Sequence, residues 1–462
     1  MAAGGTFTRR TVLAGGGAAA LATRLPAMTG GKAVRARDRL EAALGRIADP
    51  AGEGARTFLT LYADGARMAA DAADARAAHG GSIGPLDGVI VGVKDLFDVA
   101  GEPTRAGSRI LADAPAAAVD APVIQRLRAA GAVIVGKINM VEFAFSGVGL
   151  NPHFGTPGNP ADRVRVPGGS TSGGGVAVAD GMCEVAIGTD TGGSCRIPAG
   201  LCGVVGYKPT KRRVPTQGAF PLSPTLDSIG PIAPTVAACA RTDAVLAGET
   251  PWVLEAASLT GLRMAVAQGM PLSELDATVG ARFTEALSTL AKSGAMLSDM
   301  VLPQLDAMAR VNAKAPLVSV EANRVHRDRV AAQRDAYDPF VLARIEAGGA
   351  VSDAEHQAML TERQHLIAAM DAGLSGVDVL VMPTTPIVAP TMAEVATTEG
   401  FVSRNRLLLR NTAIANFFDL CAISLPLPRG NGLPVGLMLV ARGGQDRRLF
   451  AMAAGVERMF AS

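Results

Sequence analysis

Aromatic residues are scarce in this chain: they make up 4% of its 462 residues, with one tryptophan and three tyrosines. Carbohydrate grooves and base-stacking surfaces depend on exposed aromatic rings, so this scarcity argues against both kinds of site. Charge of one sign is also missing, because the formal net charge is only +2. Nucleic-acid binding needs an excess of basic residues to neutralise phosphates, and we therefore expect no nucleic-acid partner.

Residues that commonly bind metal ions are few as well. The chain has five cysteines and five histidines, and their spacings match neither a zinc-binding pattern nor HExxH. The GxxxxGK[ST] loop of nucleotide-binding proteins is also missing. We therefore expect no metal and no cofactor, and we interpret most of the cysteines as small buried residues.

The usual serine-enzyme motifs are missing or misplaced. SxxK does not occur, and GxSxG occurs once, at residues 80–84. A nucleophile elbow needs a strand before this motif and a helix after it, whereas here a helical pattern precedes it and an apolar strand follows. We interpret residues 80–84 as a chance match in a loop.

What is present indicates an α/β protein. Hydrophobic residues make up 48% of the chain and charged residues 19%, enough for a large core. Apolar periodicity predicts alternating helices and strands. Helices are predicted over residues 34–48, 66–78, 122–130, 279–292 and 447–459, with another after a capping box formed by Ser352 and Glu355; strands are predicted over residues 89–93, 132–135, 185–187, 377–382, 422–425 and 435–440.

We expect a single domain over residues 33–462, in which residues 255–376 form a mainly helical insertion that shapes the substrate site. The N-terminal residues 1–27 are expected to be removed from the mature fold. Arg9 and Arg10 precede an uncharged apolar run, which resembles a twin-arginine export signal. This predicts an exported, periplasmic protein, and the run is too short for stable membrane insertion; a plain N-terminal tail with a chance Arg-Arg pair is the alternative.

Glycine and hydroxyl residues concentrate in two segments. Residues 167–175 carry Ser170 and almost no side chains other than hydroxyls, and Gly192-Gly193-Ser194 follows 24 residues after Ser170. Glycines before a serine allow the backbone to turn its N–H groups towards one point. Such N–H groups can stabilise an oxyanion, where loss of one donor costs roughly 3–4 kcal/mol.

A serine hydroxyl needs a base to become a good nucleophile, and no histidine lies in these segments. The chain has seven lysines, and Lys94 follows an apolar strand. Burial at such a position would lower the pKa of the amine, so that a neutral Lys94 could accept a proton. A second serine, Ser170, could relay that proton from Ser194.

Several ordered motifs resemble the amidase signature family over about residues 34–460. The similar segments are residues 92–95, 136–144, 169–170, 188–194, 203–210, 226–231 and 432–437. The resemblance implies a central mixed β-sheet flanked by helices on both faces. It also implies a Ser-cisSer-Lys triad of Ser194, Ser170 on a cis peptide after Gly169, and Lys94. The implied oxyanion hole consists of the backbone N–H groups of Thr191, Gly192, Gly193 and Ser194.

Other residues near these motifs are expected to support the site: Gly169, Thr171, Thr189, Asp190 and Arg196. Thr171 and Thr189 are expected to hydrogen-bond within the site or to cap a helix. Asp190 and Arg196 are expected to pair and brace the loop. Cys195 replaces the β-branched aliphatic residue that is commoner in the family; we expect its thiol to point away from the nucleophile.

The resemblance implies hydrolysis of a carboxamide C–N bond to a carboxylate and ammonia or an amine, through an acyl-enzyme on Ser194. Two alternatives remain open: the glutaminase-type component of a tRNA-dependent amidotransferase, and a catalytically silent binding homologue. The export signal argues against the first and the complete triad against the second. The expected partner is a small-molecule amide, with an apolar acyl group suggested by the Met- and Ala-rich residues 308–370; a homodimer is left open.

Overall fold

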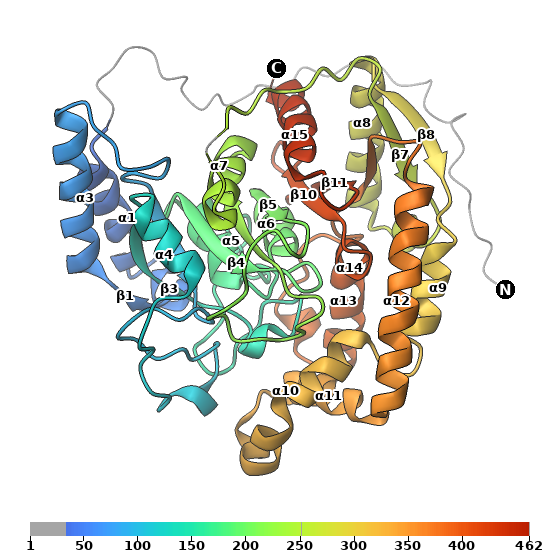
Figure 1. The fold of residues 1–462 in the computed structure, drawn as a ribbon, viewed down its shortest axis with the longest axis horizontal. Coiled ribbons are helices and arrows are strands. Elements are labelled where there is room, and N and C mark those ends of the chain that lie inside the picture. Colours follow the sequence, from blue (N-terminus) through green and yellow to red (C-terminus); the bar gives the residue numbers. More distant parts are fainter. Residues whose placement is uncertain (1–33, 251, 462) are drawn as a thin grey trace.

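The computed structural model describes residues 34–250 and 252–461, so the expected export signal at residues 1–27 lies outside the described part. One sheet of 11 strands crosses the molecule in the order β1-β3-β2-β4-β6-β5-β10-β11-β9-β7-β8 (Figure 1). The strands are β1 Phe58–Leu61, β2 Ile90–Lys94, β3 Val133–Ile138, β4 Val185–Thr189, β5 Val205–Lys208, β6 Ile229–Ala233, β7 Arg263–Ala267, β8 Met296–Met300, β9 Val379–Pro383, β10 Cys421–Pro426 and β11 Gly436–Ala441.

The sheet is mixed, as expected. Strand β2 is parallel to both β3 and β4, and β7 is parallel to both β8 and β9, whereas the central pairs from β4 to β9 are antiparallel. Successive side chains of a strand point to opposite faces. In β2, Ile90 and Val91 accordingly belong to two different hydrophobic clusters, one on each face of the sheet.

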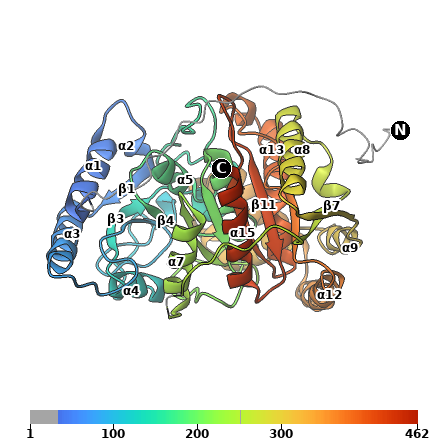
Figure 2. The same ribbon diagram turned by 90° about the horizontal axis from the view of Figure 1, so that it is seen from above.

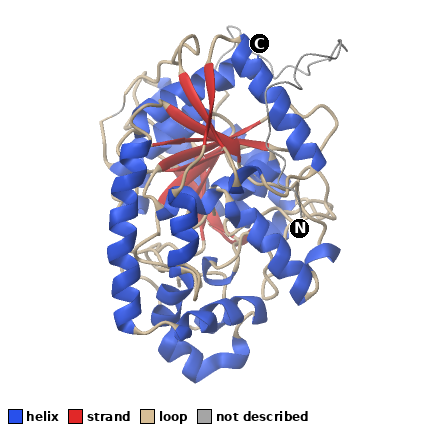
Figure 3. Cartoon of the chain, turned by 90° about the vertical axis from the view of Figure 1, so that its right-hand side faces the viewer, coloured by secondary structure: helices blue, strands red, loops and turns tan. Residues whose placement is uncertain are grey.

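Helices cover both faces of this sheet (Figures 2 and 3). They are α1 Ala36–Ala48, α2 Gly54–Thr57, α3 Ala63–Ala78, α4 Pro122–Ala129, α5 Ser172–Ala179, α6 Arg196–Cys202, α7 Val236–Ala247, α8 Ala277–Lys292, α9 Gln304–Val311, α10 Leu317–Gln333, α11 Pro339–Ala347, α12 Asp353–Gly373, α13 Thr398–Arg410, α14 Thr412–Phe417 and α15 Asp446–Ala461. The α/β fold class predicted from the sequence is therefore confirmed. Among residues 34–250 and 252–461, no helix combines the length and the hydropathy of a membrane span.

The capping box at the start of α12 forms as predicted. The hydroxyl of Ser352 accepts a hydrogen bond from the backbone N–H of Glu355, and the Glu355 carboxylate accepts one from the backbone N–H of Ser352 at 2.8 Å. These two bonds satisfy amides that a helix N-terminus otherwise leaves unpaired. They explain why this 21-residue helix begins at Asp353.

Residues 255–376 contain helices α8 to α12, but they also supply strands β7 and β8. These strands extend the central sheet, because β7 pairs in parallel with β9, which lies beyond this segment. The residue pattern predicts a mainly helical segment, with helices over residues 279–292 and after Ser352, and it predicts neither strand; the exposed β8 carries no clear apolar alternation. The segment is therefore part of the sheet as well as a cover for the site.

Candidate active site

Lys94 and Ser170 meet at one edge of the sheet. Lys94 is the last residue of β2, and both its side chain and that of Ser170 are fully buried. The Lys94 ammonium Nζ donates hydrogen bonds to Ser170 Oγ at 2.8 Å and to Thr189 Oγ1 at 2.9 Å. Thr189 ends the neighbouring parallel strand β4, so the two strands deliver their last side chains to the same place.

The peptide bond between Gly169 and Ser170 is cis, as the resemblance implied. The Gly169 backbone is packed closely: a Cβ at this position would lie 2.8 Å from a Val141 methyl carbon and 2.9 Å from the Gly149 nitrogen. The Ser170 carbonyl accepts a hydrogen bond from the Val141 N–H at 3.0 Å. Only glycine fits before Ser170, which explains the residue type at position 169.

The loop that carries Ser194 lies beside the Ser170 loop. The Ser194 carbonyl accepts a hydrogen bond from the Thr171 N–H at 3.2 Å, which joins the two loops through their backbones. Gly193 has a φ of 132°, and a Cβ there would lie 2.2 Å from Thr412 Oγ1. A side chain at residue 193 would therefore displace the turn that presents Ser194.

Four successive backbone N–H groups in this loop, from Thr191 to Ser194, donate no hydrogen bond within the described part of the chain. The next amide, that of Cys195, bonds to the Asp190 carboxylate at 3.2 Å. On the other side of the loop, the Thr412 hydroxyl donates to the Gly192 carbonyl at 2.6 Å. The loop thus has free N–H donors next to Ser194, while the Gly192 carbonyl is held by Thr412.

A buried ion pair braces this loop. The carboxylate of Asp190 and the guanidinium of Arg196 have no exposed surface and meet through two hydrogen bonds, of 2.7 and 3.0 Å. Asn416 donates to the Asp190 carboxylate at 2.9 Å and accepts from Arg196 at 2.7 Å. Burial alone would raise the pKa of Asp190, but the charge and hydrogen bonds of Arg196 outweigh it and lower that pKa.

The two threonines behave differently. Thr189 accepts the Lys94 hydrogen bond described above, whereas Thr171 Oγ1 is buried with no hydrogen-bond partner among the described residues. A third threonine, Thr191, donates its hydroxyl hydrogen to Asp227 Oδ1 at 2.6 Å. Thr189 and Thr191 are therefore joined to the site by their side chains, and Thr171 by its backbone.

Cys195 points away from the cavity that Ser194 lines. Its thiol donates to the Gly230 carbonyl at 3.4 Å, and burial raises its pKa to about 12. A thiol is nucleophilic only as thiolate, so this environment opposes a role as nucleophile.

Burial lowers the pKa of Lys94 to about 8, and the negative charges of Asp190 and Asp227 oppose part of this effect. Desolvation disfavours the charged form of an amine. A substantial fraction of Lys94 is consequently neutral near pH 8, in direct contact with a serine hydroxyl. A neutral amine in this position can accept a proton from the Ser170 hydroxyl.

Sequence reasoning missed Asn416 and Thr412, which belong to α14 and lie more than 200 positions from the Ser194 loop. No local pattern marks them. Asp227 lies within the family-like segment at residues 226–231, but its contact with Thr191 was not anticipated. Among the described residues, no cluster of three or more histidine, cysteine, aspartate or glutamate side chains could hold a metal ion.

Ser194, Thr191 and Gly192 line a cavity of about 750 Å³. Most of its walls are apolar, with Phe340 of α11 and Phe401 of α13 stacked at a ring-centre distance of 4.2 Å.

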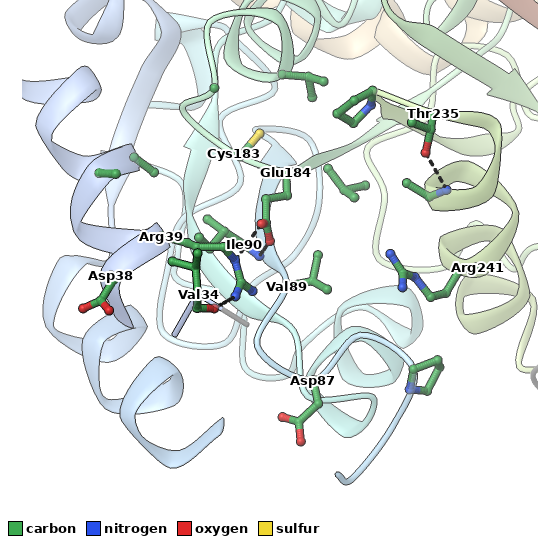
Figure 4. Close-up of a pocket in the computed structure, with 18 of the residues that line it drawn as sticks. Val34, Asp38, Arg39, Asp87, Val89, Ile90, Cys183, Glu184, Thr235 and Arg241 are labelled. Atoms are coloured by element: carbon green, nitrogen blue, oxygen red, sulfur yellow. Dashed lines mark hydrogen bonds and ion pairs between the residues drawn. The ribbon is translucent and has the colours of Figure 1, made fainter. Parts of the chain in front are cut away.

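A cavity of about 870 Å³ lies elsewhere, between α1 and α7, where Arg39 pairs with Glu184 at 2.8 Å (Figure 4). None of the predicted site residues lines this second cavity.

The chain is similar to known proteins over most of its length. A family model described as Amidase matches residues 38–450. The chain is 36% identical to a 2-amino-5-chloromuconic acid deaminase of Comamonas testosteroni over 400 residues, which cover 85% of this chain and 86% of that protein. It is also 36% identical to the A component of the glutamyl-tRNA(Gln) amidotransferase of Anaeromyxobacter dehalogenans, with 92% and 93% covered.

Among solved structures, the fold resembles a protein described as an amidase with a TM-score of 0.83 and 32% identity, covering 92% of this chain and 96% of the other. The chain therefore belongs to the amidase signature family. It is an amide-hydrolysing enzyme.

Proposed function

We propose that this enzyme hydrolyses the C–N bond of a carboxamide through an acyl-enzyme on Ser194, with Ser170 as proton relay and Lys94 as base. The observation that carries this proposal is the buried 2.8 Å hydrogen bond from Lys94 to Ser170, next to a Ser194 loop with four free N–H groups. An amine with a lowered pKa supplies the base that a serine nucleophile needs.

In the first half of the reaction, neutral Lys94 accepts a proton from Ser170 while Ser170 takes the proton of Ser194. The Ser194 oxygen bonds to the amide carbon, and the negative oxygen that forms accepts hydrogen bonds from the free N–H groups of residues 191–194. The relay then returns the proton to the leaving nitrogen, the C–N bond breaks, and ammonia or an amine departs.

In the second half, water takes the place of the leaving group. The same relay removes a proton from the water as its oxygen attacks the ester carbon of the acyl-enzyme. The proton returns to Ser194 when the C–O bond breaks, which releases a carboxylic acid and restores the free enzyme. No redox step or cofactor is required for this balance.

The cavity walls favour an apolar acyl group. Phe340, Phe401 and Leu317 line the space next to Ser194, and Met308 from the Met- and Ala-rich segment does so too. Met370, from the same segment, is buried in a separate hydrophobic cluster and does not line the cavity. The proposed substrate is thus an amide of an aliphatic or aromatic carboxylic acid.

Arg344 supports a second candidate, in which the substrate also carries a carboxylate. Its guanidinium lines the cavity with its central carbon 4.4 Å from the Phe145 ring centre, and it has no acidic partner among the described residues. Burial lowers its pKa to about 10, which leaves it charged at neutral pH. Two known kinds of substrate would supply such a carboxylate. The deaminase relative is named for an acid, and glutamine, the substrate of the glutaminase-type alternative, carries a carboxylate as well.

The test is a panel of amides that contains hexanamide, phenylacetamide, acetamide, glutamine and succinamic acid. We expect ammonia release from the apolar amides by the wild type and none from Ser194→Ala, with an acyl mass adduct on Ser194 after rapid quenching. A preference for glutamine or succinamic acid that Arg344→Met abolishes would favour the second candidate. Ammonia release by Ser194→Ala at the wild-type rate would contradict the proposed nucleophile.

The relatives include amidotransferase components, so assembly into such a complex is an alternative. We propose instead that the enzyme acts alone outside the cytoplasm, because Arg9 and Arg10 begin an export-type segment. Fractionation of cells that express the full chain should find it in the periplasm, and Arg9→Lys with Arg10→Lys should retain it in the cytoplasm. The same distribution of the wild type and the double variant between the two compartments would contradict the periplasmic localisation. Co-purification of the enzyme with stoichiometric partner proteins would contradict the proposal that it acts alone.

A further inference from the structure

Residues 222–228 form a short wall segment of the substrate cavity, beside the loop that carries Ser194. Leu222 and Leu226 line the cavity that Ser194 lines. At the end of this wall segment, the Asp227 carboxylate accepts the Thr191 hydroxyl at 2.6 Å and the backbone N–H of Leu222 at 3.0 Å. One carboxylate therefore joins the wall segment to the loop with the free N–H groups.

A second carboxylate, which comes from α10, also holds the wall segment. Glu321, on α10, is 5% exposed and accepts the Ser223 hydroxyl at 2.5 Å and the Thr225 N–H at 3.0 Å. Its other oxygen accepts the Thr225 hydroxyl. Three donors of the wall segment thus converge on one side chain of α10.

The start of α10 is itself part of the cavity. Leu317, Val318 and Ser319 line the same space as Leu222 and Leu226. Glu321 follows within one turn of these residues, so its hydrogen bonds set the separation between two walls of the cavity. His356 of α12 is the nearest basic group, with Nε2 3.5 Å from Glu321 Oε1.

We propose that Glu321 is a positioning residue that determines which acyl groups the cavity accepts, by fixing the wall segment against α10. The inference rests on the proposed amide hydrolysis. A buried hydrogen-bond donor that loses its acceptor is costly, so removal of the Glu321 charge lets the wall segment move to new partners. Large acyl groups contact this wall, whereas the acetyl group of acetamide is too small to depend on it.

The experiment compares hexanamide with acetamide in wild type, Glu321→Gln and the control Asp328→Asn. Glutamine keeps the side-chain size but its NH₂ group cannot accept a hydrogen bond from Thr225 or Ser223. Asp328 is exposed on the same helix and loses the same charge in its variant. Thermal unfolding is measured for all three proteins to establish that they fold.

We expect Glu321→Gln to raise KM for hexanamide about tenfold and to change KM for acetamide less than threefold, while Asp328→Asn resembles the wild type. An equal loss with both amides, or no loss with either, would overturn the inference. If Glu321→Gln does not fold, Ser223→Ala combined with Thr225→Val removes two of the donors from the other side and gives the same test. Wild-type inactivity on every amide would contradict the proposed function itself, whereas an active wild type with an unchanged preference would contradict only the role of Glu321.

Discussion

Lys94 Nζ donates a hydrogen bond of 2.8 Å to Ser170 Oγ, and neither residue has exposed surface. A charged amine in such a place lacks water and has only hydroxyl groups as hydrogen-bond partners. This favours the neutral form, in which the nitrogen can accept the proton that Ser170 gives up. In the proposed mechanism this pair supplies the base, because no histidine lies in the segments that carry Ser170 and Ser194.

The pH dependence of the reaction follows from this pair. Because the pKa of Lys94 is lowered to about 8, kcat/KM should rise tenfold per pH unit below pH 8 and level off above it. Folding stability should also rise between pH 8 and the ordinary lysine value of 10.5, because the unfolded chain there binds the proton more strongly. A flat kcat/KM from pH 6 to 9 on a non-ionisable amide would argue against Lys94 as the base.

Loss of the relay hydroxyl should slow the chemistry without unfolding the protein. Proton transfer by a positioned side chain contributes about 10²–10⁴ to the rate, so Ser170→Ala should lower kcat by that factor. Ser172, two residues further on, is buried with no side-chain partner in the described part, so Ser172→Ala is the matched control. Stopped assays of ammonia release check both, and an active Ser170→Ala would remove Ser170 from the mechanism.

The Thr412 hydroxyl should affect kcat, because its hydrogen bond holds the backbone of the loop that carries Ser194. It donates to the Gly192 carbonyl at 2.6 Å, which keeps that carbonyl away from the free N–H groups. Loss of one oxyanion-hole donor lowers kcat by a factor of about 10²–10³. Thr412→Val removes no such donor and only loosens the loop, so it should lower kcat less, by about tenfold. KM should change little. A variant with raised KM and normal kcat would place Thr412 in substrate binding instead.

The Asp190–Arg196 pair should stabilise the fold. Removing one partner of a buried ion pair leaves an uncompensated charge and costs about 3–5 kcal/mol. Asp190→Asn should therefore lower the free energy of unfolding by about that amount in denaturant titrations. For comparison, Lys314→Ala, which removes only the exposed pair with Glu355, should change the free energy of unfolding far less. Equal effects of the two changes would contradict the bracing role.

The local elements were predictable because their signals are local. The strand before Lys94, the Pro122 start of α4 and the capping box of α12 each depend on residues a few positions apart. Strands β7 and β8 are not predicted from the residue pattern: β8 is an exposed edge strand with no clear apolar alternation, and β7 takes its place by pairing with β9, which lies far along the chain. Their place in the sheet depends on tertiary contacts.

The residues of the proposed mechanism can be picked out along the chain alone: two serines in glycine-rich segments and one lysine after an apolar strand, together with the glycines that their loops require. The side chains that surround them are brought there by the folding of distant segments. Thr412 and Asn416 reach the Ser194 loop from α14, and Glu321 reaches the cavity wall from α10. Such contacts join segments about 100 to 220 residues apart, where the geometry of the folded sheet, and no spacing along the chain, sets which side chains meet.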